Sequence, residues 1–167
     1  MLFIKKLIIF FWVMLLVGCG AMQIDMDSFI QPPSCNIEVI DNRPYKYIVS
    51  DSFRPMETVP EGSIEKILKA KLCNSEIFLK WYGGGKSVSI SIDEISFLCS
   101  NFITHADGIL FINGTLKANT INQQIKASAI IKIVGFIWNA MPDLINKCLD
   151  DFVNKIEKTI LVIPIEW

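Results

Sequence analysis

The chain has 167 residues, of which 51% are hydrophobic, so it is long enough for one domain with a substantial core. Its 16 Lys and Arg residues nearly balance its 17 Asp and Glu residues, and the formal net charge is −1. Because there is no basic excess, the composition argues against binding to nucleic acid and against electrostatic attraction to anionic lipid.

Residues 1–18 have the order of an export signal. Lys5 and Lys6 precede an unbroken apolar run, Leu7–Val17, and the small residue Gly18 follows it. The apolar run has 11 residues, whereas a transmembrane helix needs about 20. We therefore expect a signal peptide and not a membrane-spanning helix.

Cys19 is the most specific feature of this signal. Because it directly follows Leu16-Val17-Gly18, the segment resembles a bacterial lipoprotein signal, the lipobox. The resemblance implies that the Cys19 thiol carries a diacylglycerol, that cleavage falls between Gly18 and Cys19, and that the new amino end is acylated. Several acyl chains hold a protein stably on a bilayer. An ordinary cleavage site after Gly18 is the alternative.

The expected location and domain organisation follow from this signal. Gly20 follows the cysteine, whereas an Asp at that position marks retention in the inner membrane in the enteric pattern. We therefore expect an outer-membrane lipoprotein that faces the periplasm. The chain then divides into a signal peptide (1–18), the lipidated cysteine with a flexible tether (19–35) and a single periplasmic α+β domain (36–167).

Four further cysteines are candidates for disulfides, which the oxidising periplasm permits: Cys35, Cys73, Cys99 and Cys148. Four cysteines allow three pairings, and the sequence does not choose among them. Four buried, unpaired thiols are the alternative. No C-x-x-C sequence occurs, so the chain offers neither a redox motif nor a zinc knuckle, and we expect no metal site.

The first half of the expected domain contains a strand, a loop and a helix. Residues 36–41 alternate between apolar and polar side chains, which predicts a strand. Residues 44–58 have no strong period and are expected to form a loop. Residues 60–72 place Ile and Leu at helical spacing, which predicts a helix. Residues 76–81 fit either a short strand or a continuation of that helix.

The second half predicts long antiparallel strands and a closing helix. Residues 87–99 form a strand whose apolar positions change face at Asp93-Glu94, which predicts a bulge there. Residues 108–118 and 124–134 have the pattern of a hairpin. Residues 142–159 carry a continuous apolar stripe and are expected to close the domain as a helix.

These elements predict an α+β fold, with a small mixed, mainly antiparallel sheet and two helices packed on one face. The first strand precedes the first helix in the chain. We therefore expect this strand to lie parallel to a neighbour through a right-handed crossover.

The sequence offers no constellation that predicts catalysis. His105 is the only histidine, so acid–base chemistry or a catalytic triad would have to rest on it, and it lies in a polar loop. Gly85-Lys86-Ser87 resembles the end of a phosphate-binding P-loop, but Lys80 stands where that motif requires glycine. We interpret the first as a surface residue and the second as a turn, and we expect no enzyme activity, no catalytic residues and no cofactor.

Asp41 and Arg43 are the remaining candidate site. Residues two apart at the end of a strand point to the same face. There the carboxylate and the guanidinium would form a bidentate pair that pins the strand to the loop after it. Such a turn either serves the structure alone or binds a partner, and we favour the structural interpretation.

The order of these features resembles the YajG-type lipoproteins and the related auxiliary lipoproteins of ABC-type lipid transport systems. The resemblance rests on Cys19, on Val39–Arg43 and on the predicted strands between Val88 and Val134. It implies a non-enzymatic envelope role, in which the lipid anchor binds the membrane and the domain binds an envelope protein or a lipid. Two rivals remain: an outer-membrane assembly factor resembling LptE, and a small periplasmic hydrolase that uses His105.

Overall fold

The computed structural model describes residues 21–50, 55–83, 87–100, 106–118, 121–133 and 137–162. Cys19 with the rest of the lipobox, and the single histidine His105, lie outside the described residues, as do Gly85 and Lys86. The interpretations placed on them therefore stay predictions.

Seven strands of the described chain belong to one mixed sheet. The strands are β1 (Met22–Asp25), β2 (Glu38–Asp41), β3 (Tyr47–Ser50), β4 (Met56–Val59), β5 (Val88–Ser100), β6 (Ala106–Ala118) and β7 (Ile121–Ile133). The helices are a short 3-10 helix, η1 (Asp27–Phe29), and the α-helices α2 (Ser63–Asn74), α3 (Glu76–Tyr82) and α4 (Ile137–Val162).

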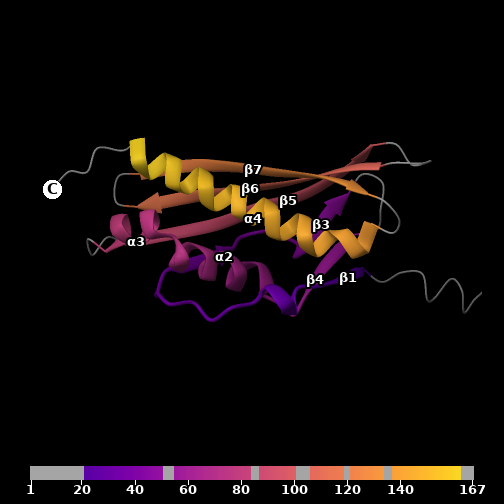
Figure 1. Ribbon diagram of the computed structural model, residues 1–167, viewed down its shortest axis with the longest axis horizontal. Coiled ribbons are helices and arrows are strands. Elements are labelled where there is room, and N and C mark those ends of the chain that lie inside the picture. Colours follow the sequence, from indigo (N-terminus) through magenta and orange to yellow (C-terminus); the bar gives the residue numbers. More distant parts are fainter. Residues whose placement is uncertain are drawn as a thin grey trace, which may run out of the picture.

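The three long strands β5, β6 and β7 form an antiparallel meander, so the predicted hairpin is confirmed (Figure 1). On its other side β5 pairs in parallel with both β2 and β3, and β4 and β1 follow beyond β3. Most of the paired positions are antiparallel, and the first predicted strand does lie parallel to a neighbour. The predicted α+β class with a mixed, mainly antiparallel sheet is confirmed.

The apolar positions of β5 shift by one residue halfway along the strand, while the buried face stays the same. The register against β6 shifts between Ile92 and Glu94, which leaves Asp93 as the extra residue of a bulge. Ile92 is fully buried before the bulge, and Ile95 and Phe97 are buried after it. Because successive side chains of a strand alternate between faces, an unbulged strand would turn the second apolar group to the opposite side. The predicted bulge is confirmed.

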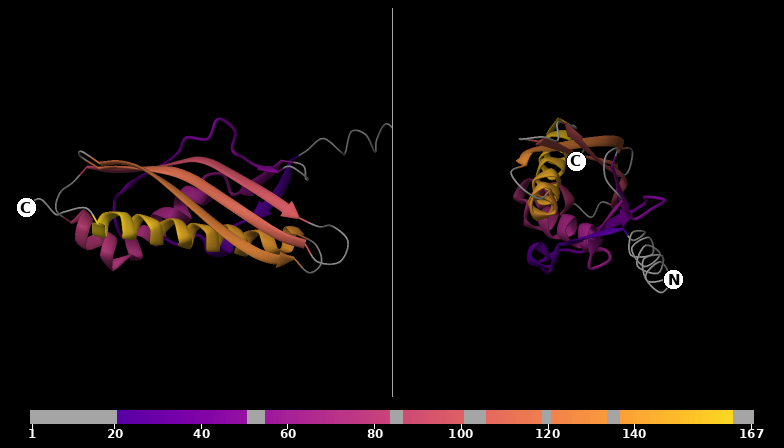
Figure 2. Two further views of the ribbon diagram at one scale, coloured as in Figure 1. Left: turned by 90° about the horizontal axis from the view of Figure 1, so that it is seen from above. Right: turned by 90° about the vertical axis from the view of Figure 1, so that its right-hand side faces the viewer.

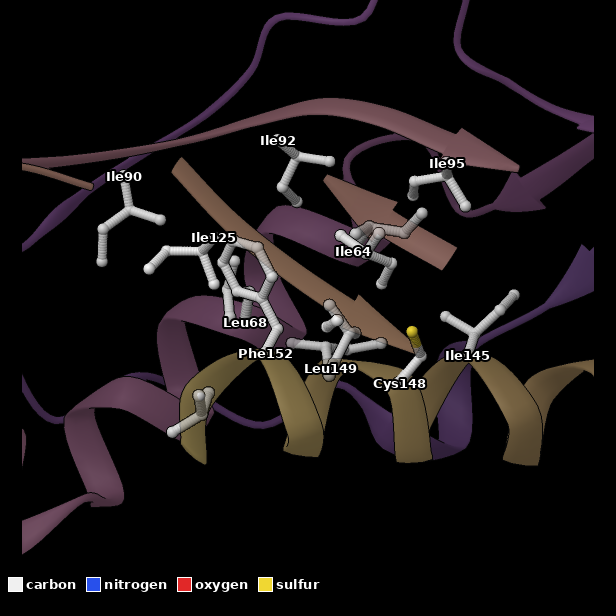
Figure 3. Close-up of a cluster of buried hydrophobic side chains, with 14 of the residues drawn as sticks. Ile64, Leu68, Ile90, Ile92, Ile95, Ile125, Ile145, Cys148, Leu149 and Phe152 are labelled. Atoms are coloured by element: carbon white, nitrogen blue, oxygen red, sulfur yellow. The ribbon is translucent and has the colours of Figure 1, made fainter. Parts of the chain in front are cut away.

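α4 covers one face of the long strands, which we call the inner face of the sheet (Figures 1 and 2). Its apolar stripe from Ile145 to Ile160 is buried, as predicted. Cys148, Leu149 and Phe152 point from α4 toward the sheet (Figure 3). α2 and α3 lie beside α4 on the same side, in contact with it, so the core is closed between the sheet and three helices.

The number of helices differs from the two predicted. Residues 76–81, which fit either a strand or a continuation of the preceding helix, belong to the separate helix α3. Ser75 adopts an extended backbone conformation between the two helices, and its hydroxyl accepts a hydrogen bond of 3.0 Å from the backbone N–H of Phe78. This is an N-cap, which satisfies a donor that the first turn of a helix leaves unpaired.

Two segments predicted to lack regular structure contribute strands. The tether prediction for residues 19–35 is wrong from Met22 onward, because β1 pairs in parallel with β4 and Met26 is fully buried. The loop prediction for residues 44–58 is also wrong, because β3 and most of β4 fall in this range. Each of these strands has four residues, so the alternation is too short to distinguish from loop and only the pairing partner defines the strand.

Two side chains of α4 bond to the backbone of β7, the last strand in the order. The Asp151 carboxylate accepts a hydrogen bond of 3.0 Å from the backbone N–H of Ser128, and Lys155 Nζ donates one of 2.6 Å to the carbonyl of Lys126. Burial alone would raise the pKa of Asp151, but the Ser128 N–H and the Lys155 ammonium outweigh it and hold that pKa below its ordinary value. These contacts occupy backbone groups that an edge strand otherwise offers to another chain.

Replacing Gly114 by Ala should destabilise the fold. A Cβ at this β6 position would lie 2.2 Å from the Ser91 carbonyl oxygen and 2.7 Å from Cζ of Phe152, so strand or helix must move. We expect a loss of about 1–3 kcal/mol, the usual cost of forcing extra atoms into a packed core. Urea unfolding measures it, with Lys117→Ala on the exposed side of the same strand as the control. Equal midpoints for the two variants would contradict the packing described here.

Candidate functional site

The turn at residues 42–46 interrupts the pairing along one edge of β5. β2 pairs with positions 89–92 of β5, and β3 pairs with positions 96 and 97, beyond the bulge. The Asn42 backbone N–H donates a hydrogen bond of 2.9 Å to the carbonyl of Ile92, the last contact before the chain leaves the edge. The turn projects from the side of the sheet away from α4 (Figure 2, left).

Asp41 and Arg43 close this turn with a bidentate ion pair. Arg43 Nη2 lies 2.7 Å from Asp41 Oδ2, and Arg43 Nε lies 2.8 Å from Asp41 Oδ1. The two side chains are only 4% and 3% exposed. The guanidinium also reaches the carbonyl of Tyr47 at 3.4 Å, where β3 begins. The pair therefore joins the end of one strand to the start of the next.

The ion pair sets the charge state of Asp41. Burial alone would raise the pKa of this carboxyl, but the hydrogen bonds and the charge of Arg43, aided by Lys46, outweigh it and lower the pKa below its ordinary value. Lys46 Nζ lies 3.4 Å from Asp41 Oδ1 and also donates to the Asp41 carbonyl. The carboxylate thus stays ionised at neutral pH in a nearly buried position.

A hollow of ≈280 Å³, which we call the bulge pocket, lies between this turn and the bulge of β5. Its walls are mainly apolar and aromatic, and carboxylates stand beside them. Its lining includes Pro44, Tyr45, Tyr47, Val49, Asp93 and Glu94. Tyr45 is 71% exposed and Val49 58%, so the pocket is open to solvent.

The carboxylates of the bulge pocket are held in place by hydroxyl and amide groups. Asp93 accepts hydrogen bonds from Ser91 Oγ at 2.9 Å and from Thr115 Oγ1 at 2.7 Å. Glu94 accepts one from Asn113 Nδ2 at 2.8 Å. These donors are neutral, and within the described residues neither carboxylate has a Lys or Arg within ion-pair distance. Two negative charges therefore stand unneutralised beside an apolar wall.

Beyond this pocket, the outer face of the sheet carries a row of aligned apolar side chains. Leu98 of β5 stands opposite Ile109 of β6, which stands opposite Ile130 of β7. Leu98 is 40% exposed and Ile130 65%. The described helices lie on the inner face (Figure 2), and the exposure of Leu98 and Ile130 shows that the described residues leave this row largely uncovered. We call these three residues the outer row.

The second hollow beside the turn, of ≈230 Å³, is highly charged. Arg43 and Lys46 line it together with Glu57, Glu61 and Glu65. It lies on the other side of the Asp41–Arg43 pair and faces the start of α2. Its lining carries charges of both signs and is more polar than that of the bulge pocket.

The structure contains a disulfide between Cys35 and Cys73, so two of the four candidate cysteines are paired. This disulfide ties the segment before β2 to the end of α2. Cys99 and Cys148 are free thiols, and Cys148 is fully buried. Burial, with Asp151 nearby, raises the pKa of the Cys148 thiol to about 12, so this sulfur is not a nucleophile at neutral pH. Burial and Asp107 also raise the pKa of Cys99.

Neither family models nor curated proteins give a match to this sequence. None of the helices in the described ranges has the combination of length and apolar composition needed to cross a membrane. Among these same residues, His, Cys, Asp and Glu side chains do not gather in threes where an ion could be held.

Sequence reasoning found the Asp41–Arg43 turn and the bulge at Asp93 but did not connect them. They are about 50 residues apart, and only the parallel pairing of β2 and β3 with β5 brings them together. Tyr45, Tyr47 and Val49 gave no usable signal in the sequence, since their exposure is defined only by the folded sheet.

Arg43→Ala should destabilise the domain by about 3–5 kcal/mol, because it leaves the buried Asp41 carboxylate without its partner. Arg43→Lys should lower the stability less, since it keeps the positive charge and loses only the bidentate contact. Lys46→Ala, whose side chain is 46% exposed, is the control and should cost under about 1 kcal/mol. Urea unfolding gives all three values. Similar losses for Arg43→Ala and Lys46→Ala would contradict the assigned role.

The Asp41 pair should also make stability depend on pH. Because folding lowers the pKa of Asp41 from its ordinary value, the contribution is fully present above about pH 5 and is lost as the pH falls through the folded value. Asp151 acts in the same direction, so the test compares acid unfolding of the wild type with that of Asp41→Asn. The variant should lose less stability between pH 5 and pH 2. Parallel curves of unfolding free energy against pH would mean that folding does not lower the pKa of Asp41.

Replacing Cys35 and Cys73 together by Ala should lower stability by about 2–4 kcal/mol. The bridge spans a sequence separation of 38 residues, and cross-linking a loop of that size restricts the unfolded chain. Cys99→Ala, at a partly exposed free thiol, is the control. Alkylation of the unfolded, unreduced protein should modify Cys99 and Cys148 and spare Cys35 and Cys73. Full labelling of all four before reduction would show that the bridge does not form.

Proposed function

We propose that this protein is a lipid-anchored envelope protein that binds a protein partner through the outer face of its sheet. The observation that carries the proposal is the outer row, Leu98, Ile109 and Ile130, together with the exposed Tyr45 and Val49 beside it. Apolar side chains aligned on an uncovered face mark interaction sites, because a soluble surface gains nothing from exposing them.

Two features support the export and anchoring part of the proposal. The sequence Leu16-Val17-Gly18-Cys19 has the form of a lipobox, and the Cys35–Cys73 disulfide suits an oxidising compartment such as the periplasm. The order of lipobox, Asp-x-Arg turn, helix, long strands and closing helix also supports a likeness to the auxiliary lipoproteins of ABC-type transport systems. On this proposal the acyl chains reside in the outer membrane and the domain faces the periplasm.

The position of β1 shortens the expected tether to almost nothing. Met22 is the first residue of β1, so only Gly20 and Ala21 separate it from Cys19. Three Cα–Cα steps of 3.8 Å span at most about 11 Å. A lipid on Cys19 would therefore hold the sheet close against the bilayer, and the domain would meet partners in or beside the same membrane.

Cys19→Ala should abolish lipid attachment and leave an unlipidated precursor. The thiol is the only site for the diacylglycerol, so incorporation of labelled palmitate should fall to background in the variant. Cys99→Ala is the matched control and should label like the wild type. Separation of inner and outer membranes then places the lipidated form. Undiminished palmitate labelling of Cys19→Ala would remove the anchor from the proposal.

A further inference from the structure

We propose that the bulge pocket is the anchor point for the partner, and that it receives an apolar side chain flanked by Lys or Arg from a segment of the partner protein. This inference rests on the proposed partner-binding function and specifies its chemistry. The pocket adjoins the outer row, because Val49 pairs with Ser96 of β5, two residues from Leu98. The pocket and the row thus form one continuous surface.

The size of the pocket favours an inserted side chain. Its volume of ≈280 Å³ is just below the roughly 300–1,000 Å³ of sites that enclose a small molecule. Interfaces concentrate their binding energy where one or a few anchors enter such a hollow and nearly neutral contacts surround them. The outer row supplies those surrounding contacts.

The charges around the pocket favour a partner segment that carries Lys or Arg beside its apolar side chain. Asp93 and Glu94 stand at its rim without a cationic partner among the described residues, whereas Arg43 is already engaged by Asp41. An incoming Lys or Arg would find carboxylate oxygens already fixed by Ser91, Thr115 and Asn113, so little reorganisation is needed. An acidic segment would meet like charges and be rejected.

The aromatic walls favour the same partner. Tyr45 and Tyr47 line the pocket and are 71% and 39% exposed. A cation over the face of a tyrosine ring gains attraction in addition to that of the carboxylates. Tyrosine also loses little side-chain entropy when it is buried by a partner, which makes it an effective contact residue. Apolar, aromatic and acidic groups therefore converge on one ligand type.

The three tyrosines of the chain give a direct test. Tyr45 and Tyr47 line the pocket, whereas Tyr82 lies on α3, where its ring stacks on Phe78. Full-length protein labelled with 3-fluorotyrosine and held in nanodiscs should give three ¹⁹F signals, assigned by single Tyr→Phe variants. The probes are the peptides acetyl-Gly-Lys-Leu-Lys-Gly-amide, its Glu counterpart, and a third in which Gly replaces Leu.

The Lys-Leu-Lys peptide should shift the Tyr45 and Tyr47 signals and leave Tyr82 unmoved. Its Glu counterpart should bind at least tenfold more weakly, and the peptide without Leu should also lose affinity. Glu94→Gln should weaken binding two- to fivefold, as expected for one partly exposed ion pair. Glu38→Gln, at an exposed carboxylate of β2 outside the pocket, should leave it unchanged.

Equal binding of the Lys and Glu peptides, or shifts confined to Tyr82, would overturn the proposal. So would shifts of Tyr45 and Tyr47 caused by vesicles of phosphatidylethanolamine and phosphatidylglycerol alone, since the pocket would then be a lipid contact. The titration repeated on Cys19→Ala in detergent separates this inference from the anchoring proposal. Retained peptide selectivity with undiminished palmitate labelling of Cys19→Ala means that the anchoring proposal alone fails. Lost palmitate labelling without peptide selectivity means that this inference alone fails.

Discussion

The bulge at Asp93 is the constraint on which the rest of the sheet depends. β5 joins the long antiparallel strands to the short strands of the sheet, and it buries Ile92 before the bulge and Ile95 after it on the same side. One extra residue shifts the alternation of side chains by one position, so the apolar residues before and after the bulge face the same side of the sheet. The same region brings the Ser91 carbonyl so close to position 114 of β6 that only glycine fits, and the ring of Phe152 occupies the space that a side chain would take. α4 is thereby seated on the sheet at the level of the bulge.

The bulge also divides the neighbouring edge into two short strands. β2 ends where the bulge begins and β3 starts beyond it, so the chain must leave the edge between them. The turn between the two strands places polar backbone groups and the Asp41–Arg43 pair close to the core. The Asp41–Arg43 contact compensates by satisfying both charges at 2.7 and 2.8 Å and by reaching the backbone of β3. The structural and partner-binding interpretations of this turn are therefore compatible: the buried pair fixes the turn, and its exposed residues Pro44 and Tyr45 form the surface.

The parts of the fold that the sequence predicted are those with long periodic patterns. The stripe of α4 and the phase change in β5 extend over enough residues to be read from alternation alone. β1, β3 and β4 have four residues each, and their strand character comes from partners elsewhere in the chain, which a local pattern does not contain. The candidate site divides in the same way: residues close together in sequence were predicted, and residues brought together only by strand pairing were not. Asp41 and Arg43 are neighbours in sequence, whereas Tyr45 and Glu94 share a pocket only after the sheet has formed. The pairing of Cys35 with Cys73 likewise depends on how α2 packs beside the segment before β2.

A sheet with one face closed by helices and the other left open gives the molecule two unequal sides. The inner side is already covered, because α4 packs on it and also bonds to the backbone of β7 through Asp151 and Lys155. New contacts are therefore most easily made on the outer side, where apolar side chains lie beside carboxylates that have no Lys or Arg partner among the described residues. If the lipid is attached at Cys19, the short reach to Met22 limits how far this side can turn from the membrane plane. A partner held in the same envelope layer would then meet a surface that is already near it, and part of the orientational cost of association would be met by the anchor.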